Sequence, residues 1–456
     1  MKTYHIKTYG CQMNYSDSER METYLQALGL SPCKDYKTAD LIIFNTCSIR
    51  QKAEDRVFSE IYKVEQLKKK KKDLLVVVTG CMIRKSSSRY STERDALFPR
   101  MAALDIALRI DELPSLASLM REIQPALDIE AIEEESLEDY FQINASHSSH
   151  EAKTQAFVAI SNGCDKFCTY CIVPYSRGRE KSRKMEDIIA ECEKLVEIGV
   201  KEITLIGQTV NSYGLGKADE ESGKFANLKE KEPFVALLEK LDLLHEKGLE
   251  RVRFTSPHPQ DMSDQLIEAM AVLKTQMPYL HLPVQSGDNR TLKRMNRTYT
   301  IEQYREIIKK LRAKIPDISI STDIIVGFCG ETDEEFEKTL KFYEEMAFEH
   351  AYIAQYSQRR GTTADRFMKD DIPQKVKKQR WHKLNFLLVK MAERGYKRFL
   401  NKTVNVLVEN QNGKTCMGRS EHFKAVQFNS GRKLLGQIVP VKITRAREIL
   451  LEGELV

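Results

Sequence analysis

Apolar runs of β-strand length alternate with amphipathic helical patterns from the start of this chain. In the first part, strand-like runs cover residues 4–10, 41–45 and 74–79. Residues 16–28 and 53–68, which lie between them, place apolar side chains at spacings of three and four, as a helix with one buried face does. This alternation predicts an α/β fold that begins with a doubly wound parallel sheet, with helices on both faces.

The same alternation returns about six times in the middle of the chain. Six strand–helix units suit either a doubly wound sheet or an incomplete (β/α) barrel, and periodicity alone does not choose between them. The candidate strands are residues 156–161, 202–207, 251–255, 279–284, 319–326 and 351–356, and the clearest helical patterns are 185–198, 233–247, 301–314 and 333–346.

The C-terminal part has a different pattern and a different charge. A long basic helical stretch, 374–400, precedes five short alternating runs separated by turn residues, which predict a small antiparallel β-barrel. Residues 395–456 hold eleven Lys or Arg against five Glu and no Asp, which equals the net charge of +6 of the whole chain. Such a module suits a polyanionic partner such as nucleic acid, although a solvated basic face without a partner gives the same composition. The five runs are residues 404–409, 415–419, 425–428, 435–443 and 448–452.

Three cysteines stand close together directly after the first strand of the middle part. Cys164, Cys168 and Cys171 form a CxxxCxxC pattern in the loop at the carboxyl end of that strand, where α/β enzymes place their sites. Three thiolates can ligate three irons of a 4Fe–4S cluster and leave the fourth iron open for S-adenosylmethionine, whose reductive cleavage gives a 5′-deoxyadenosyl radical. The alternative is structural zinc, which usually takes four protein ligands, whereas His258 and His281 are isolated.

Three further cysteines occupy equivalent positions in the first part. Cys11, Cys47 and Cys81 each follow one of the three strand-like runs, at spacings of 36 and 34 residues. Parallel strands end on the same edge of a sheet, so the three thiols are expected to meet there. We expect a second three-cysteine 4Fe–4S cluster with an open iron; the alternative is three inert buried cysteines.

Other candidates are single polar residues in loops on the same predicted face. Gln208 and Asn211 follow one strand and could hydrogen-bond a cofactor or substrate, and Asp323 begins a segment that leads into a glycine-bounded loop. Arg177 and Arg179 follow the cysteine loop and could bind a carboxylate or phosphate of the substrate. An ordinary solvated loop is the alternative for each of them.

Over about residues 4–453 the chain resembles the radical S-adenosylmethionine methylthiotransferases, and most of all their tRNA-modifying branch. The resemblance rests on six cysteines in the right order and context. The matching stretches are residues 10–14, 45–50, 79–82, 163–179, 281–287 and 293–297.

The resemblance implies a methylthiotransferase domain at 1–121, a linker at 122–153, a partial (β/α)6 radical core at 154–380 and an RNA-binding TRAM barrel at 381–456. It implies that Cys11, Cys47 and Cys81 hold an auxiliary cluster that delivers sulfur, which one S-adenosylmethionine methylates. A second S-adenosylmethionine, supported by Tyr170, would be cleaved at Cys164, Cys168 and Cys171.

The implied reaction is methylthiolation of C2 of N6-isopentenyladenosine at position 37, beside the tRNA anticodon, with a low-potential electron donor as partner. Sister enzymes methylthiolate N6-threonylcarbamoyladenosine in tRNA or an aspartate of a ribosomal protein, and these stay as alternatives. A non-catalytic RNA-binding metalloprotein is the alternative of another class.

Two positions depart from the family pattern: Cys329 and Lys184 stand where proline is usual, so the geometry of those loops is open. No apolar run reaches the ~20 residues that span a bilayer, and the first ten residues show no secretory signal, so we expect a cytoplasmic protein without a membrane anchor.

Overall fold

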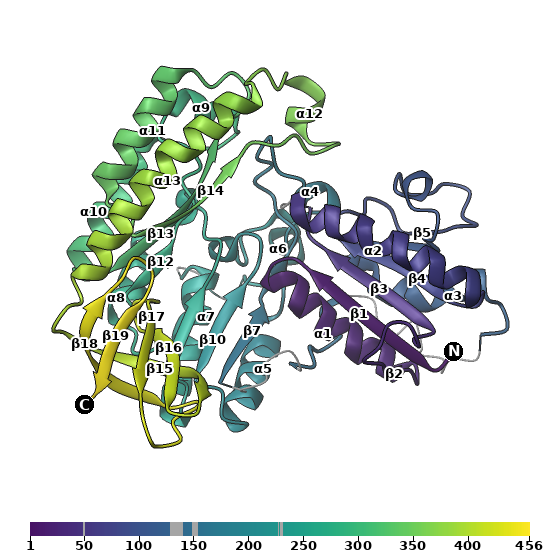
Figure 1. The fold of residues 1–456 in the computed structure, drawn as a ribbon, viewed down its shortest axis with the longest axis horizontal. Helices are drawn as coiled ribbons and strands as arrows, with labels where there is room; N and C mark the ends of the chain where they lie inside the picture. The colour runs from purple at the N-terminus through teal and green to yellow at the C-terminus, as the bar shows by residue number, and fades with distance from the viewer. Residues whose placement is uncertain (49–50, 128–139, 148–153, 227, 229–230) are drawn as a thin grey trace. The chain divides into compact units, whose positions relative to one another are not determined.

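The computed structural model describes residues 1–48, 51–127, 140–147, 154–226, 228 and 231–456 of the chain (Figure 1). It divides into two compact units. The first comprises residues 1–149 together with 162–165 and 171–181, and the second comprises 150–161, 166–170 and 182–456. Part of the loop with the CxxxCxxC pattern is therefore built into the N-terminal unit.

The first unit contains a six-stranded sheet in the order β2-β1-β3-β4-β6-β5. The three predicted strands are β1 (Thr3–Tyr9), β3 (Leu41–Thr46) and β4 (Leu75–Gly80), which pair in parallel. Sequence patterns missed the three short strands, which are β2 (Ser31–Pro32), β5 (Ser87–Ser88) and β6 (Ile106–Leu108). Only β5 runs antiparallel to its neighbour.

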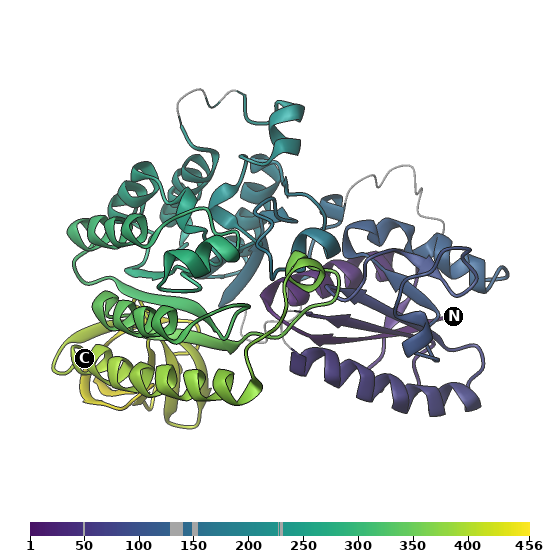
Figure 2. The same ribbon diagram turned by 90° about the horizontal axis from the view of Figure 1, so that it is seen from above.

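Two helices cover opposite faces of this sheet (Figures 1 and 2). Leu41 and Ile43 of β3 pack in a core with helix α1 (Gln12–Ala27), whereas Ile42 and Phe44 pack in a separate core with α2 (Gln51–Lys70). Alternate strand residues point to opposite faces, so these fully buried strands need a helix on each side. Helix α3 (Leu116–Ile123) shares the core of α1. The predicted doubly wound sheet is confirmed.

The second unit begins with six parallel strands in two three-stranded sheets, β7-β10-β11 and β12-β13-β14. Within each sheet, every strand lies beside its predecessor in the barrel, and an isolated bridge pairs Val252 of β11 with Gln276, just before β12. A doubly wound sheet would reverse its strand order at a switch point, so this sequential order selects the partial barrel. The strands are β7 (Gln155–Ala159), β10 (Glu202–Ile206), β11 (Arg251–Phe254), β12 (Tyr279–His281), β13 (Ser319–Val326) and β14 (His350–Gln355).

Helices follow the barrel strands and share one large apolar core with them. The longer ones are α5 (Met185–Glu197), α7 (Pro233–Asp242), α8 (Asp264–Val272), α10 (Ile301–Lys314) and α11 (Asp333–Met346). The short elements of this part of the chain are α6 (Lys217–Ser222), α9 (Asn289–Arg294), α12 (Thr363–Phe367), the paired β8 (Ser161–Asn162) and β9 (Lys181–Ser182), and α4 (Val173–Ser176), which lies within the first unit.

Helix α13 (Gln374–Lys397) leads into a closed five-stranded barrel, β15-β16-β17-β19-β18. The predicted small barrel is confirmed, with one difference: β17 and β19 pair in parallel, while every other pair is antiparallel. The final strand also begins later than predicted, at Leu451. The barrel strands are β15 (Thr403–Asn412), β16 (Thr415–Ser420), β17 (Ala425–Asn429), β18 (Ile438–Ala446) and β19 (Leu451–Leu455).

The predicted linker, 122–153, is described only in part, since residues 128–139 and 148–153 lie outside the described residues. Its described part includes Tyr140, which is buried in the core of the first unit and donates a hydrogen bond to Asp17 at 2.6 Å. The predicted domain boundaries stay predictions. None of the helices in the described part of the chain has the length and apolar character needed to cross a membrane.

Candidate cysteine sites

Cys11, Cys47 and Cys81 lie together at one edge of the N-terminal sheet. The amide of Cys47 donates to the carbonyl of Tyr9, and that of Cys81 donates to the carbonyl of Thr46, both at 2.9 Å, so each loop leaves its strand in register with its neighbour. The Cys47 thiol hydrogen-bonds both Cys11 and Cys81. The three thiols predicted to meet are in contact.

The contact shifts the pKa values of the three thiols in opposite directions. Hydrogen bonds with Cys11 and Cys81, together with burial, raise the pKa of Cys47. The hydrogen bond with Cys47 lowers the pKa of Cys11 to about 7. The pKa of Cys81 is lowered to about 5, first by the hydrogen bond with Cys47 and then, against burial, by the adjacent Arg177. Thiolates are the form that binds metal, so the group is disposed to accept one.

Two glycines allow the cysteine loops to approach one another. A methyl group at Gly80, whose φ is +89°, would lie 2.3 Å from the carbonyl oxygen of Thr46. A methyl group at Gly10 would lie 2.1 Å from Oδ1 of Asn14 and 3.0 Å from Cβ of Cys47. At Gly80 the clash is with the backbone of the neighbouring loop, so any side chain there would push the two loops apart, whereas at Gly10 a side chain would displace the Asn14 side chain and crowd Cys47.

A buried pair of asparagines, which sequence reasoning missed, ties the first two loops together. The Asn14 side chain accepts a hydrogen bond from the backbone of Cys11 at 3.1 Å and donates to Oδ1 of Asn45 at 2.9 Å. Asn45 donates in turn to the carbonyl of Asn14 at 2.7 Å. The positions two before Cys47 and three after Cys11 were visible in the sequence, but nothing there showed that they face each other.

Arg177 lies beside this group of cysteines, within the first unit. Its Nε is 3.5 Å from Sγ of Cys81, and its other nitrogens bond Asp17 at 2.5 Å and Asn162 at 3.0 Å. The side chain of Arg177 is 1% exposed and that of Asp17 is fully buried. Its predicted contact with substrate stays a prediction. Asp17 carried no signal in the sequence.

The CxxxCxxC loop has its own tight turn. The amide of Cys164 donates to the carbonyl of Gly178 at 3.2 Å. Gly163 has a φ of +81°, and a methyl group there would lie 2.1 Å from the carbonyl oxygen of Arg179. The glycine before Cys164 is therefore required, as Gly10 and Gly80 are before Cys11 and Cys81.

The segment that contains Asn296 and Arg297 holds the part of this loop that belongs to the second unit. Nη1 of Arg297 lies 3.5 Å from Sγ of Cys168. Asn296 donates to the carbonyl of Phe167 at 3.0 Å, and the amide of Thr169 donates to the carbonyl of Met295 at 3.0 Å. Residues 293–297, which the sequence marked only as a match to the family pattern, thus help to shape the cysteine loop.

The remaining predicted site residues have the following surroundings, and their roles stay predictions. Tyr170 packs edge-on against Phe328. Gln208 is partly buried, while Asn211 is buried and hydrogen-bonds both backbone groups of His258. Asp323 lies 3.4 Å from Nε2 of His281. Arg179 is 49% exposed and pairs with Asp165 at 2.9 Å.

The donors in both places are thiols, which is the chemistry that iron–sulfur clusters require. Within the described ranges, no three His, Cys, Asp or Glu side chains are arranged to hold a single metal ion. A 4Fe–4S cluster does not need that arrangement, because each thiolate binds a different iron. Three thiols with no carboxylate or imidazole among them fit such a cluster and fit a hard cation poorly.

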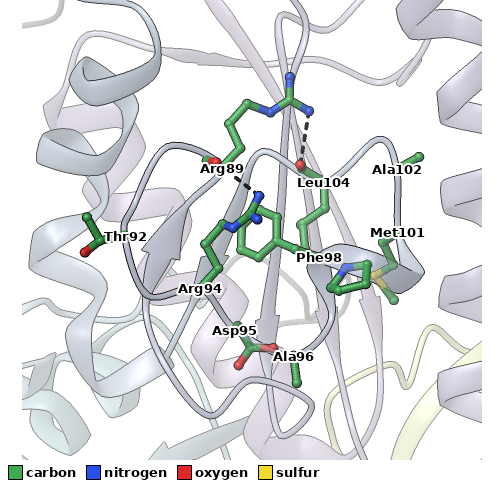
Figure 3. Close-up of a pocket in the computed structure, with 10 residues that line it drawn as sticks. Arg89, Thr92, Arg94, Asp95, Ala96, Phe98, Met101, Ala102 and Leu104 are labelled. Atoms are coloured by element: carbon green, nitrogen blue, oxygen red, sulfur yellow. Dashed lines mark hydrogen bonds between the residues drawn. The ribbon is translucent and has the colours of Figure 1, made fainter.

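A cavity of about 620 Å³ lies elsewhere in the first unit (Figure 3). Arg89, Arg94, Phe98 and Thr92 are among the residues that line it, and no cysteine does. Its arginines are already engaged: Arg89 binds Asp105 and the carbonyl of Leu104, and Arg94 donates to the carbonyl of Arg89. No predicted site residue lines the cavity, so it is not part of the candidate cysteine sites.

Three family models match the chain in order. They are described as Uncharacterized protein family UPF0004 (residues 3–98), Radical SAM superfamily (158–343) and TRAM domain (397–456).

Full-length relatives match as well. A Staphylococcus haemolyticus protein named tRNA-2-methylthio-N(6)-dimethylallyladenosine synthase is 40% identical over 99% of this chain and 84% of its own length. A Geobacillus kaustophilus protein of the same name is 39% identical over 100% of this chain and 82% of its own.

Among solved structures, the chain is similar to the radical S-adenosylmethionine methyltransferase TsrM from Kitasatospora setae. The TM-score is 0.54 at 14% sequence identity, over 78% of this chain and 73% of that one. At this identity, the similarity shows the fold alone.

Proposed function

The chain belongs to the tRNA-2-methylthio-N(6)-dimethylallyladenosine synthase family of radical S-adenosylmethionine enzymes, and on that premise we propose that it methylthiolates tRNA with the help of two 4Fe–4S clusters. The substrate is N6-isopentenyladenosine at position 37, and the product carries a 2-methylthio group at C2. The observation that carries this proposal is the pair of three-cysteine groups, each placed by a strand end and a required glycine.

Cys164, Cys168 and Cys171 would hold the cluster that binds S-adenosylmethionine. With S-adenosylmethionine bound, that cluster supplies radical chemistry, which suits the C2–H bond of adenine because that bond offers no acid for ordinary base catalysis. Arg297 donates to the Cys168 sulfur, and Asn296 fixes the loop backbone, so both residues preset the shape of the loop. Tyr170, Gln208, Asn211 and Asp323 are proposed to surround the cofactor.

Cys11, Cys47 and Cys81 would hold the auxiliary cluster, which supplies the sulfur. The two asparagines and the two glycines hold the three thiols at one sheet edge, and the hydrogen bond with Cys47, followed by the charge of Arg177, lowers the pKa of Cys81. The binding set is therefore formed by the fold before any cluster is present.

The closed C-terminal barrel would bind the tRNA. Its basic charge attracts the phosphate backbone, and this attraction gives affinity without sequence preference. Position 37 lies in a single-stranded loop, where a base can turn out of its stack into an active site. A low-potential protein that delivers single electrons is the required partner.

Anaerobic reconstitution of the full chain tests this proposal. We expect about eight irons per chain, two clusters of four, and release of 5′-deoxyadenosine that depends on reductant. Added tRNA that carries N6-isopentenyladenosine should gain the methylthio group. Bound zinc without release of 5′-deoxyadenosine would contradict the proposal.

A further inference from the structure

In the described part of the chain, a buried arginine donates a hydrogen bond to a sulfur of each three-cysteine group. Arg177 donates to Cys81 and Arg297 to Cys168, in both cases with nitrogen and sulfur 3.5 Å apart. Both arginines are buried, at 2% and 9% exposure. A guanidinium out of solvent carries its full charge at short range, so each arginine acts on its sulfur in a medium that screens little.

The two arginines differ in what balances their charge. Arg177 pairs with Asp17 at 2.5 Å, and this carboxylate also accepts a hydrogen bond from Tyr140 at 2.6 Å. Arg297 instead donates to the carbonyl of Pro283 at 2.9 Å and to the hydroxyl of Tyr299 at 3.0 Å. Throughout the described residues, Arg297 forms no ion pair with a carboxylate.

The charged residues around these two arginines do not remove the difference in charge balance. Near Arg297, Lys166 and Asp261 form an ion pair at 2.6 Å and cancel each other, and burial lowers the pKa of His258, which leaves it neutral. Near Cys81, Arg84 donates to the Cys81 carbonyl at 2.7 Å. The carboxylates of Asp95 and Glu54 are close enough to Arg84 to stabilise its positive charge. Among the described residues, the arginine beside Cys168 thus has no carboxylate to balance it, whereas the arginines near Cys81 have carboxylates beside them.

We propose that this difference in charge sets the reduction potentials of the two clusters apart, so that an incoming electron goes to the cluster at Cys164, Cys168 and Cys171. This inference rests on the proposed function. Reduction adds one negative charge, which a net positive neighbour stabilises, and net charge and hydrogen bonds to sulfur are established determinants of cluster potential.

The electron transfer has a simple balance. A low-potential one-electron donor is oxidised by one electron, and the cluster beside Arg297 is reduced by the same electron, with no bond or proton exchanged. The auxiliary cluster stays oxidised because Asp17 cancels the charge that would favour its reduction. Arg177, Arg297 and Asp17 are positioning residues in this scheme, since they act through the cysteines.

Redox titration followed by electron paramagnetic resonance tests the proposal. Each cluster is measured alone in the reconstituted full chain, with the cysteines of the other group changed to alanine. In the chain that keeps Cys164, Cys168 and Cys171, Arg297→Gln should lower the midpoint potential, and Arg297→Lys, which keeps the charge, should shift it less. In the chain that keeps Cys11, Cys47 and Cys81, Asp17→Asn should raise the potential, because it leaves Arg177 unbalanced.

The two substitutions are expected to shift the midpoint potentials in opposite directions. A purely structural role of Arg297 and Asp17 would disturb the clusters without a fixed direction. Arg305→Gln, at an arginine of helix α10 that pairs with Glu345 at 2.7 Å, is the matched control and should leave both potentials unchanged. If both clusters form but Asp17→Asn lowers the auxiliary potential or leaves it unchanged, the inference is wrong and the proposed function stands. If either cluster fails to form in the unaltered chain, the proposed function itself fails.

Discussion

The carboxylate of Asp17 lies 2.5 Å from the guanidinium of Arg177, a residue 160 positions further along the chain, and solvent reaches neither side chain. This ion pair joins helix α1 to the segment that follows Cys171, and the same guanidinium contacts Cys81. Arg177 therefore connects the segment after Cys171 to Cys81, a member of the group formed by Cys11, Cys47 and Cys81.

Loss of Arg177 should destabilise the first unit strongly. Arg177→Met leaves the Asp17 carboxylate buried without its partner, and breaking a buried pair in this way costs about 3–5 kcal/mol of unfolding free energy. Urea unfolding of the cluster-free protein measures this cost. Arg179→Met is the control, because exposed pairs contribute about 0–1 kcal/mol. Equal effects of the two substitutions would contradict this account of the pair.

Gly80→Ala should lower the free energy of unfolding by more than the positive φ at this position alone accounts for. Gly199 has a similarly positive φ of +99° but open space around it, so Gly199→Ala measures the conformational cost, about 1–2 kcal/mol. At Gly80 the added methyl group also meets the carbonyl of Thr46 at 2.3 Å. We expect a greater loss of stability and iron content reduced to about four per chain. Full iron content in Gly80→Ala would show that the close approach is not needed.

Cys47→Ala should separate the two chemistries. Cys47 is the central thiol that contacts both Cys11 and Cys81, so its loss should remove one cluster and leave about four irons per chain. Methylthiolation should stop, while reductive cleavage of S-adenosylmethionine stays measurable. Cys33→Ser, outside both groups, should change neither iron content nor activity. Equal loss of cleavage in folded Cys47→Ala would refute the division of labour between the clusters.

Exposed cations of the C-terminal barrel should contribute to tRNA affinity through phosphate contacts. Arg432 and Lys433 lie exposed before β18, whereas Arg447 is paired with Glu452 at 2.6 Å. Changing Arg432 and Lys433 to alanine should weaken binding at low salt and reduce the slope of log affinity against log salt by about two. Arg447→Ala should change the slope less. An unchanged slope in the double variant would exclude these two residues from the RNA contact.

Much of the fold followed from the sequence because long, regular elements dominate it. Strand β13 and helices α10 and α11 have the predicted bounds, since each has a clear period and the helices begin at the capping residues Thr300 and Thr332. Strand β6, Ile106–Leu108, was missed because three residues are too few to show a period. The parallel pairing of β17 with β19 is a tertiary arrangement that no local pattern encodes.

The candidate sites were predictable as far as they depend on strand ends. Cys11, Cys47 and Cys81 meet because parallel strands end on one edge of the sheet, which sequence alone indicates. The residues that orient them did not follow from the sequence. Asp17 looks like any polar helix residue until the fold brings Arg177 to it, and Asn211, predicted to face a cofactor, hydrogen-bonds the backbone of His258.

Nucleoside analysis of tRNA by mass spectrometry tests the central claim most directly. Cells that lack this gene should accumulate N6-isopentenyladenosine without the 2-methylthio group, and the unaltered gene should restore the group, whereas the Cys47→Ala gene should not. Persistence of 2-methylthio-N6-isopentenyladenosine in cells that lack the gene, with no other enzyme able to add it, would contradict the account.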